Sequence, residues 1–213
     1  MNNNTMIREQ ICLLGASLYE RGYTHGSTGN ISVQTDEGWF VTPTNACLGR
    51  LDPNELSVIR HDGSLLSGPA PTKEVPLHLA MYRSRNNTGA VVHLHSCHSV
   101  AVSMLEGVDP DSVLPPLTPY LVMKVGKVPL LPYFRPGDLA IADAIEQLNG
   151  RYAACLLANH GPVISGIDLE SAVYAAEELE ENARLYLLLA QRGCRPLNDQ
   201  QVQELQQHFG SEW

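Results

Sequence analysis

The sequence has no apolar stretch of about 20 residues that could cross a membrane, and Met1–Thr5 lacks the basic and apolar parts of a signal peptide. Its five cysteines are scattered, and no two have the Cys-x-x-Cys spacing of a zinc or redox site. Basic residues are few, 14 Lys and Arg against 23 Asp and Glu, and they form no cluster. We therefore expect a cytoplasmic protein with reduced thiols that binds neither a membrane nor nucleic acid.

The residues that are present indicate a single domain over residues 1–213, because this length suits one core and no repeat is visible. Helical spacing predicts helices over 7–21, 74–85, 100–105, 137–148, 169–192 and 199–208. Apolar or alternating runs predict strands over 30–34, 39–42, 56–60, 90–96, 153–158 and 163–165, while 115–136 is predicted to hold loops and short strands. Because helices and strands do not alternate regularly, we expect a central, mainly antiparallel or mixed β-sheet covered by helices.

Two histidines lie one residue apart in the apolar run Ala90–Ser96. Side chains alternate along a strand, so His93 and His95 are predicted to point the same way and to bind a divalent metal together. His160 follows a second apolar strand and precedes a Gly-Pro turn, which makes it a candidate third ligand. Three protein ligands and an open position are typical of a catalytic zinc site. The alternative is that His160 is an ordinary turn residue.

Several loops contain groups that could hold an anion. Glu74 begins a predicted helix, where the helix dipole favours an acid even without a function. Thr72 and Lys73 lie where helix N-terminal amides can bind an anion. The segments Gly26–Asn30 and Thr42–Thr44 offer backbone amides and hydroxyls, although each loop alone is weak evidence for a phosphate site.

Five motifs, in their order and spacing, resemble the class II aldolase/epimerase family, which includes fuculose-phosphate aldolase and ribulose-phosphate 4-epimerase. They are Ser27–Ser32, Val41–Thr44, Pro71–Glu74, His93–His95 and Asn159–Gly161, and the resemblance covers nearly the whole chain. It implies an α/β fold of three layers (α-β-α) and a homotetramer. It also implies Zn²⁺, or another divalent metal such as Mn²⁺ or Co²⁺, held by His93, His95 and His160.

The same resemblance implies roles for further residues. Glu74 matches an acid near the metal, and Tyr120 matches a tyrosine near the reacting carbon, so either is a candidate proton donor. The implied phosphate cradle consists of Gly29, Asn30, Thr42, Thr44, Thr72 and Lys73.

Lys73 departs from the aldolase pattern, which has a small hydroxyl residue at that position. With Thr72-Lys73-Glu74 the chain resembles the branch that decarboxylates 3-oxo-tetronate 4-phosphate, a phosphorylated four-carbon keto sugar acid. This implies loss of CO₂ through a metal-stabilised enediolate to give dihydroxyacetone phosphate, in sugar-acid catabolism. The alternatives are a retro-aldolase acting on a ketose phosphate, a sugar-phosphate 4-epimerase, and a non-catalytic scaffold domain of the same fold.

Overall fold

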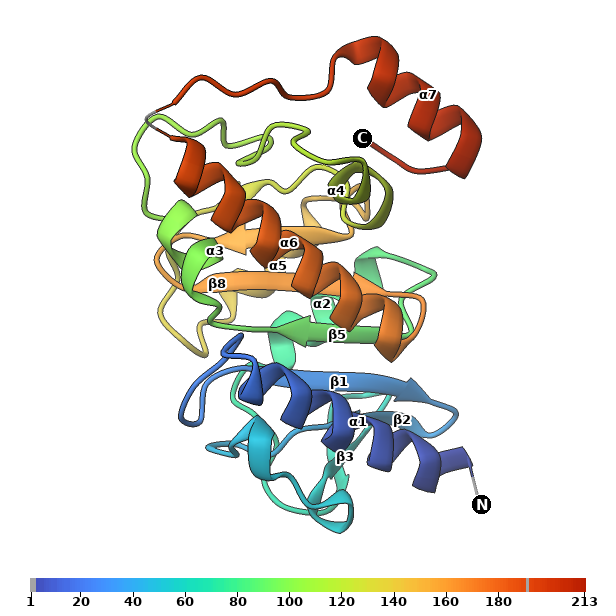
Figure 1. Ribbon diagram of the computed structural model, residues 1–213. Helices are drawn as coiled ribbons and strands as arrows, with labels where there is room; N and C mark the ends of the chain where they lie inside the picture. Colours follow the sequence, from blue (N-terminus) through green and yellow to red (C-terminus); the bar gives the residue numbers. More distant parts are fainter. Residues whose placement is uncertain (1–2, 191) are drawn as a thin grey trace.

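One eight-stranded sheet runs through the centre of the computed structural model, which describes residues 3–190 and 192–213. The strands are β1 (Asn30–Thr35), β2 (Gly38–Val41), β3 (Ser57–Arg60), β4 (Leu65–Ser67), β5 (Ala90–His93), β6 (Leu130–Leu131), β7 (Ala154–Leu157) and β8 (Gly161–Gly166). They lie in the order β4-β3-β2-β1-β5-β8-β7-β6 (Figure 1). All neighbours are antiparallel except the parallel pair β6 and β7, so the predicted mixed, mainly antiparallel sheet is confirmed.

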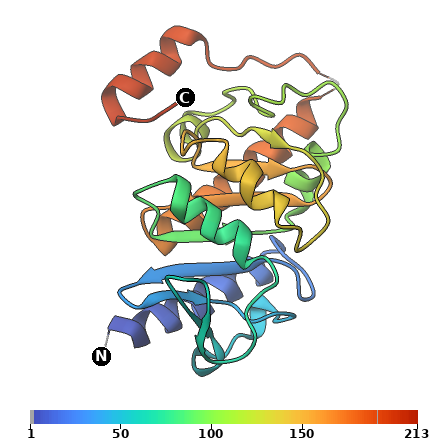
Figure 2. The ribbon, with the colours of Figure 1, turned by 180° about the vertical axis from the view of Figure 1, so that it is seen from behind.

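Helices cover both faces of the sheet, as a three-layer fold requires. α1 (Asn3–Glu20), α3 (Cys97–Val102) and α6 (Leu169–Leu189) lie on the face seen in Figure 1. α2 (Val75–Ser84) and α5 (Ala140–Glu146) pack together on the opposite face, which Figure 2 shows from behind. α4 (Pro119–Lys124) and α7 (Asp199–Phe209) complete the set, with 3-10 turns at Leu48–Arg50 and Pro53–Glu55. Among the described residues, no helix has both the length and the apolarity needed to cross a bilayer.

Alternation along β5 divides its side chains between two hydrophobic cores. Val92 is buried in the core that α6 covers, whereas Val91 is buried in the core that α2 and α5 cover. Leu94, just past the strand, is also fully buried in the α6 core. The strand period therefore continues beyond β5, which places the even positions on one face and the histidines at 93 and 95 on the other.

Some predicted boundaries are wrong. β5 ends at His93 instead of Ser96, and α3 begins at Cys97 instead of residue 100. The reason is tertiary: the buried carboxylate of Glu180 accepts hydrogen bonds from the backbone N–H groups of His98 and Ser99, both at 2.8 Å, and so caps α3 from another helix.

The proline-rich segment 115–136 contains a helix that the sequence prediction omitted. Thr118 caps α4 by accepting a hydrogen bond from the Leu121 N–H at 3.1 Å, and Pro119 occupies the first helical position. The long helix α6 begins after Asp168 as predicted, but it ends at Leu189. The strand β4 was also not predicted.

Candidate metal centre

Four side chains that are distant in sequence converge at one end of the sheet. Glu74, His93, His95 and His160 each place one ligand atom within 4.8 Å of the others. His93 ends β5, and His160 lies in the turn between β7 and β8. Because β5 and β8 are antiparallel neighbours with His93 opposite Val163, the end of β5 meets the start of β8. Strand pairing therefore brings together histidines that are 67 residues apart.

The distances within this four-residue cluster suit a small cation. His160 Nε2 lies 3.4 Å from His93 Nε2 and 3.3 Å from Glu74 Oε1. The other carboxylate oxygen, Glu74 Oε2, lies 3.5 Å from His93 Nε2. The His95 ring completes the group, with its centroid 4.7 Å from that of His160. Imidazole nitrogens with one carboxylate are a donor set that Zn²⁺ and similar ions accept.

Two observations on single atoms also fit a metal. His95 Nε2 is buried and has no hydrogen-bond partner among the described residues, which is costly for a polar atom that coordinates nothing. His93 Nδ1 lies 2.8 Å from the carbonyl oxygen of Pro162. The Nδ1–H therefore donates to that carbonyl and leaves Nε2 unprotonated toward the cluster, the tautomer that a metal ligand needs.

The protonation states of the residues in the cluster favour the binding of a cation. Burial, with further contributions from His93 and His160, lowers the pKa of His95 to about 3. Burial and the neighbouring His93 lower the pKa of His160 to about 4. For Glu74, burial opposes ionisation, but His93, the Asn30 hydrogen bond and His160 together hold its pKa below the ordinary value. At neutral pH the site offers neutral imidazole nitrogens at His95 and His160 and one negative carboxylate.

A buried chain of hydrogen bonds supports Glu74 from behind. Asn30 Nδ2 donates to Glu74 Oε2 at 2.7 Å, so its Oδ1 must accept from His78 Nε2–H, at 2.5 Å. His78 Nδ1 then accepts the hydroxyl proton of Ser32 at 2.8 Å, and the Ser32 oxygen accepts from Tyr82 at 3.0 Å. Burial lowers the pKa of His78 to about 3, which keeps the ring neutral in this chain.

Sequence reasoning missed the role of this chain of hydrogen bonds. His78 lies on α2, four residues after Glu74, the N-cap residue of that helix, and Ser32 follows Asn30 by two on one strand. Both spacings place the pair on the same face of their element, which is the signal that could have identified them.

The predicted phosphate cradle is built from three neighbouring segments. Thr72 N–H donates to the Thr42 carbonyl oxygen at 3.1 Å, and Thr44 N–H donates to Ala70 at 3.0 Å. Gly29 has a φ of +80°, and a Cβ there would lie 3.1 Å from the carbonyl oxygen of His93. The segments around residues 29, 43 and 72 thus adjoin one another beside the cluster.

The side chains of the cradle differ in availability. The hydroxyls of Thr42 and Thr72 accept hydrogen bonds from the N–H groups of Ile31 and Glu74, and both threonines are buried. Lys73 is exposed, and Thr44 is half-buried.

Tyr120 is not brought to the cluster within one chain. It lies on α4 and is 56% exposed, with Lys124 Nζ 5.4 Å from the centre of its ring. The neighbouring Lys124 lines a pocket with Ser165 and Gly166, at the end of β8 opposite to His160.

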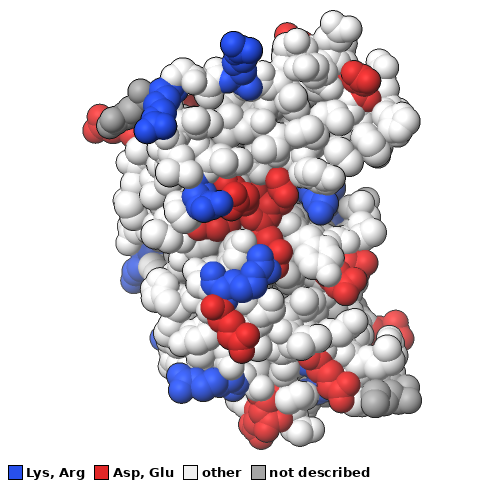
Figure 3. All heavy atoms as spheres, viewed as in Figure 1, with Lys and Arg blue, Asp and Glu red and all other residues white. Residues whose placement is uncertain are grey.

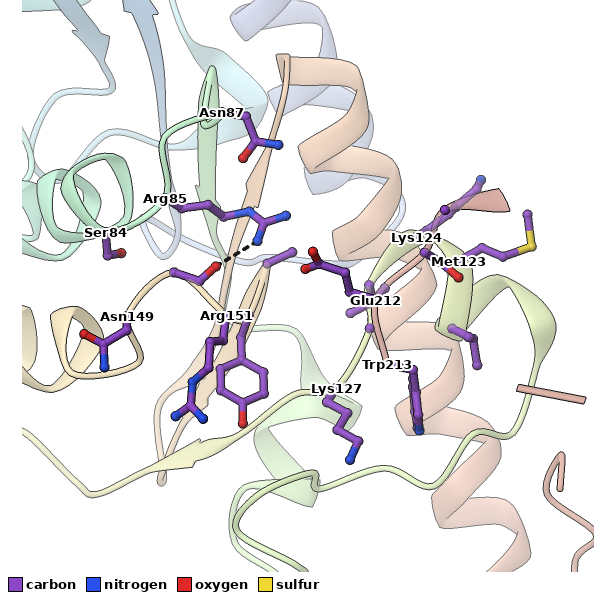
Figure 4. A pocket seen from close by; sticks show the side chains of 18 of the residues that line it. Ser84, Arg85, Asn87, Met123, Lys124, Lys127, Asn149, Arg151, Glu212 and Trp213 are labelled. Atoms are coloured by element: carbon purple, nitrogen blue, oxygen red, sulfur yellow. Dashed lines mark hydrogen bonds between the residues drawn. The ribbon is translucent and has the colours of Figure 1, made fainter. Parts of the chain in front are cut away.

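A cavity of about 910 Å³ also lies at that opposite end, and no residue of the four-residue cluster lines it (Figure 4). Its lining includes the basic residues Arg85, Lys124 and Arg151 and the acidic residue Glu212. The Arg85 guanidinium donates to the carbonyl oxygen of Gly150 at 3.0 Å. The cavity is thus separate from the candidate metal centre.

Comparison with known proteins finds related sequences and structures. The 3-oxo-tetronate 4-phosphate decarboxylase of Cupriavidus necator is 46% identical over an alignment 219 residues long, which covers 100% of both chains. The protein of the same name from Escherichia coli strain K12 is 48% identical over 200 residues, 93% of this chain and 94% of its own. The crystal structure of YgbL from Klebsiella pneumoniae is 48% identical, has a TM-score of 0.92 and covers 95% of this chain and 98% of its own.

The match to a family profile covers most of the chain. The description of this family is Class II Aldolase and Adducin N-terminal domain, and it matches residues 9–187, from within α1 to near the end of α6. That range includes every strand of the sheet and all four residues of the cluster. The chain belongs to the class II aldolase and adducin N-terminal domain family.

Proposed function

We propose that this protein is a 3-oxo-tetronate 4-phosphate decarboxylase, a carbon–carbon lyase that releases CO₂ and dihydroxyacetone phosphate. The observation that carries the proposal is the convergence of Glu74 with three histidines beside a segment bearing Lys73. Relatives of that name, 46% and 48% identical over nearly their whole length, support the choice of substrate. We further propose Zn²⁺ as the cation, with Mn²⁺ and Co²⁺ as the alternatives, held by His93, His95 and His160.

The reaction suits such a site because the substrate is a β-keto acid. When the C1–C2 bond breaks, CO₂ departs, and the electron pair left on C2 is delocalised onto the C3 oxygen. A bound divalent cation supplies Lewis-acid stabilisation of that negative charge. A proton then adds at C2. Glu74, whose pKa lies below the ordinary value, is ionised at neutral pH and must accept a proton before it can donate one, and Tyr120 is the other candidate donor.

Binding and assembly complete the proposal. We assign the substrate phosphate to the cradle of Gly29, Asn30, Thr42, Thr44, Thr72 and Lys73, because its three segments adjoin one another beside Glu74. A role for Tyr120 requires a second copy of the chain, so we propose a homotetramer in which a neighbouring subunit supplies it. All five cysteines are free, and Cys97 and Cys194 are exposed, which suits the reducing cytoplasm.

The test is a turnover assay on purified protein that has been stripped with a chelator and reconstituted with Zn²⁺. The stereoisomers of 3-oxo-tetronate 4-phosphate are supplied in turn, and CO₂ and dihydroxyacetone phosphate are followed together. Equal amounts of both products are expected for one isomer. Aldehyde release from fuculose 1-phosphate, or epimerisation of ribulose 5-phosphate, without CO₂ from any isomer would instead identify an aldolase or epimerase. A protein that binds no divalent metal and turns over none of these would be a scaffold.

A further inference from the structure

The proposed substrate has two anionic ends, a carboxylate at C1 and a phosphate at C4. The chain has a net charge of −9, and acidic side chains gather over α6 on the face shown in Figure 3. Binding such a substrate therefore needs cations placed locally at the site. Lys73 is the one cation in the predicted set of site residues, which leaves one anionic end without an assigned partner.

The loop that follows β6 passes beside the candidate metal centre. The N–H of Ala158 donates to the carbonyl oxygen of Leu131 at 3.0 Å, so β6 ends level with the residues that lead into His160. Further along, a Cβ built on Gly137 would lie 3.9 Å from the Cβ of Lys73. The loop 132–138 thus starts near one residue of the site and reaches another. Figures 1 and 2 both show it at the side of the molecule where β5 ends.

This loop carries Arg135, an exposed cation. Among the described residues, its guanidinium takes part in no hydrogen bond or ion pair, unlike those of Arg83 and Arg184, which pair with glutamates. The backbone of Arg135 is held in a turn, because its carbonyl oxygen accepts a hydrogen bond from the Asp138 N–H at 2.9 Å. Pro136 restricts the same turn. Among the described residues, Arg135 is therefore a cation without a side-chain partner, on a loop whose backbone is held in a turn.

We propose that Arg135 binds the C1 carboxylate of the substrate, an inference that rests on the proposed function. The order of the sheet supports this assignment. Within the sheet, β1 and β2, next to which Asn30 and Thr42 of the cradle lie, are on one side of the histidines, whereas β6, which Arg135 follows, is on the other side. A substrate whose C2 and C3 oxygens face the histidines extends its phosphate and its carboxylate in opposite directions. Guanidinium is also the side-chain cation that pairs with a carboxylate through two parallel hydrogen bonds.

The chemistry determines which kinetic constant this contact changes. The carboxylate loses its charge as it becomes CO₂, so an ion pair to it stabilises the bound substrate more than the transition state. Arg135 therefore selects a keto acid over a ketose phosphate by lowering KM and does not raise kcat. A residue with only a structural role would not produce this division between KM and kcat.

The experiment measures binding to the Zn²⁺-loaded protein by titration calorimetry with two probes. Tetronate 4-phosphate carries both anionic ends, and dihydroxyacetone phosphate lacks the carboxylate. Arg135→Met is expected to lower the affinity for tetronate 4-phosphate by about 10-fold. The affinity for dihydroxyacetone phosphate should stay within about twofold of that of the unsubstituted protein. Arg135→Lys should recover part of the loss, because it keeps the charge without the bidentate geometry. Arg195→Met, at another exposed arginine, is the matched control and should change neither affinity.

The outcomes separate this inference from the proposed function. Equal weakening of both probes by Arg135→Met would assign Arg135 to the phosphate and overturn the inference, and no weakening of either would make it an ordinary surface residue. The titration does not depend on turnover, so it decides the role of Arg135 even if no isomer is decarboxylated. Where turnover is measured, KM should rise about 10-fold with kcat unchanged or higher.

Discussion

Asn30 and Glu74 are joined by a hydrogen bond of 2.7 Å from the amide nitrogen of Asn30 to Oε2 of the carboxylate. This contact connects the first strand of the sheet to the acid of the candidate metal centre. The orientation of the amide follows from His78, whose Nε2–H occupies the other end of Asn30. The direction of the carboxylate is thus set, through Asn30, by His78, which belongs neither to the four-residue cluster nor to the proposed phosphate cradle.

Replacing His78 should destabilise the protein. The substitution His78→Leu leaves the buried Asn30 Oδ1 without its donor and the buried Ser32 O–H without its acceptor. Each lost partner costs roughly 1–3 kcal/mol, so we expect the free energy of unfolding, measured in urea, to fall by about 2–6 kcal/mol. Ser32→Ala removes the partner of His78 Nδ1 and of the Tyr82 hydroxyl, but His78 can still donate to Asn30, so the orientation of the Asn30 amide should be retained. Wild-type stability of His78→Leu would contradict the direction assigned to this chain of hydrogen bonds.

Removing one histidine of the cluster should weaken metal binding and slow turnover strongly. For His95→Ala we expect less than one Zn²⁺ per chain by elemental analysis and a loss in kcat/KM on the order of 10³. His208→Ala, at an exposed histidine on α7, is the control and should retain both. Full metal content and full turnover in His95→Ala would refute the proposed mechanism.

Glu180 should affect the affinity for the metal ion, although it lies on α6 and outside the four-residue cluster. Its carboxylate holds the start of α3 through Ser99, with hydrogen bonds of 2.8 Å to the N–H and 2.7 Å to the hydroxyl, just after His95. In Glu180→Gln an amide nitrogen would face these donors, so we expect Zn²⁺ affinity to fall about 10-fold in a chelator competition. Glu181→Gln, at the adjacent but exposed residue, serves as the control. Equal Zn²⁺ affinities of the two variants would show that α3 does not position His95.

Acid should destabilise the metal-free protein. His78 and His95 have folded-state pKa values of about 3 and His160 of about 4, against about 6.5 in the unfolded chain. Between these limits the unfolded state binds more protons, so stability is fully present above pH 6.5 and is lost as the pH falls toward 3. Chelator-treated protein should therefore unfold at less urea at pH 5 than at pH 7. Substituting His78 with Gln should reduce this slope, and a flat profile for the wild type would contradict these pKa values.

Tyr120 can be tested by mixing inactive variants. If a neighbouring subunit supplies Tyr120, oligomers assembled from Tyr120→Phe and His95→Ala chains contain some sites with an intact tyrosine and intact histidines. We expect each variant alone to be nearly inactive and refolded mixtures to regain a measurable fraction of turnover. Mixtures as inactive as the separate variants would argue against a shared site, whereas full activity of Tyr120→Phe alone would exclude the tyrosine as a proton donor.

Much of the fold could be predicted from the sequence because it depends on local rules. The alternation around Val91 and Val92 reports a strand between two cores, and Asp168 marks the start of α6. The errors occur where a distant group acts. α3 begins early because Glu180, some 80 residues away, caps it, and α4 was missed because its prolines suggested a loop.

The sequence by itself determined the chemical identity of the candidate site: three histidines and a glutamate in motifs that are individually short. Only the tertiary structure decided that they meet, because pairing of β5 with β8 brings His93 and His160 together across 67 residues. It also placed Gly137, two residues after Arg135, beside Lys73. It placed α4, which carries Tyr120 and Lys124, toward the end of β8 opposite to His160. Local periodicity encodes which face a side chain occupies, whereas convergence of distant segments depends on strand order, which no single segment contains.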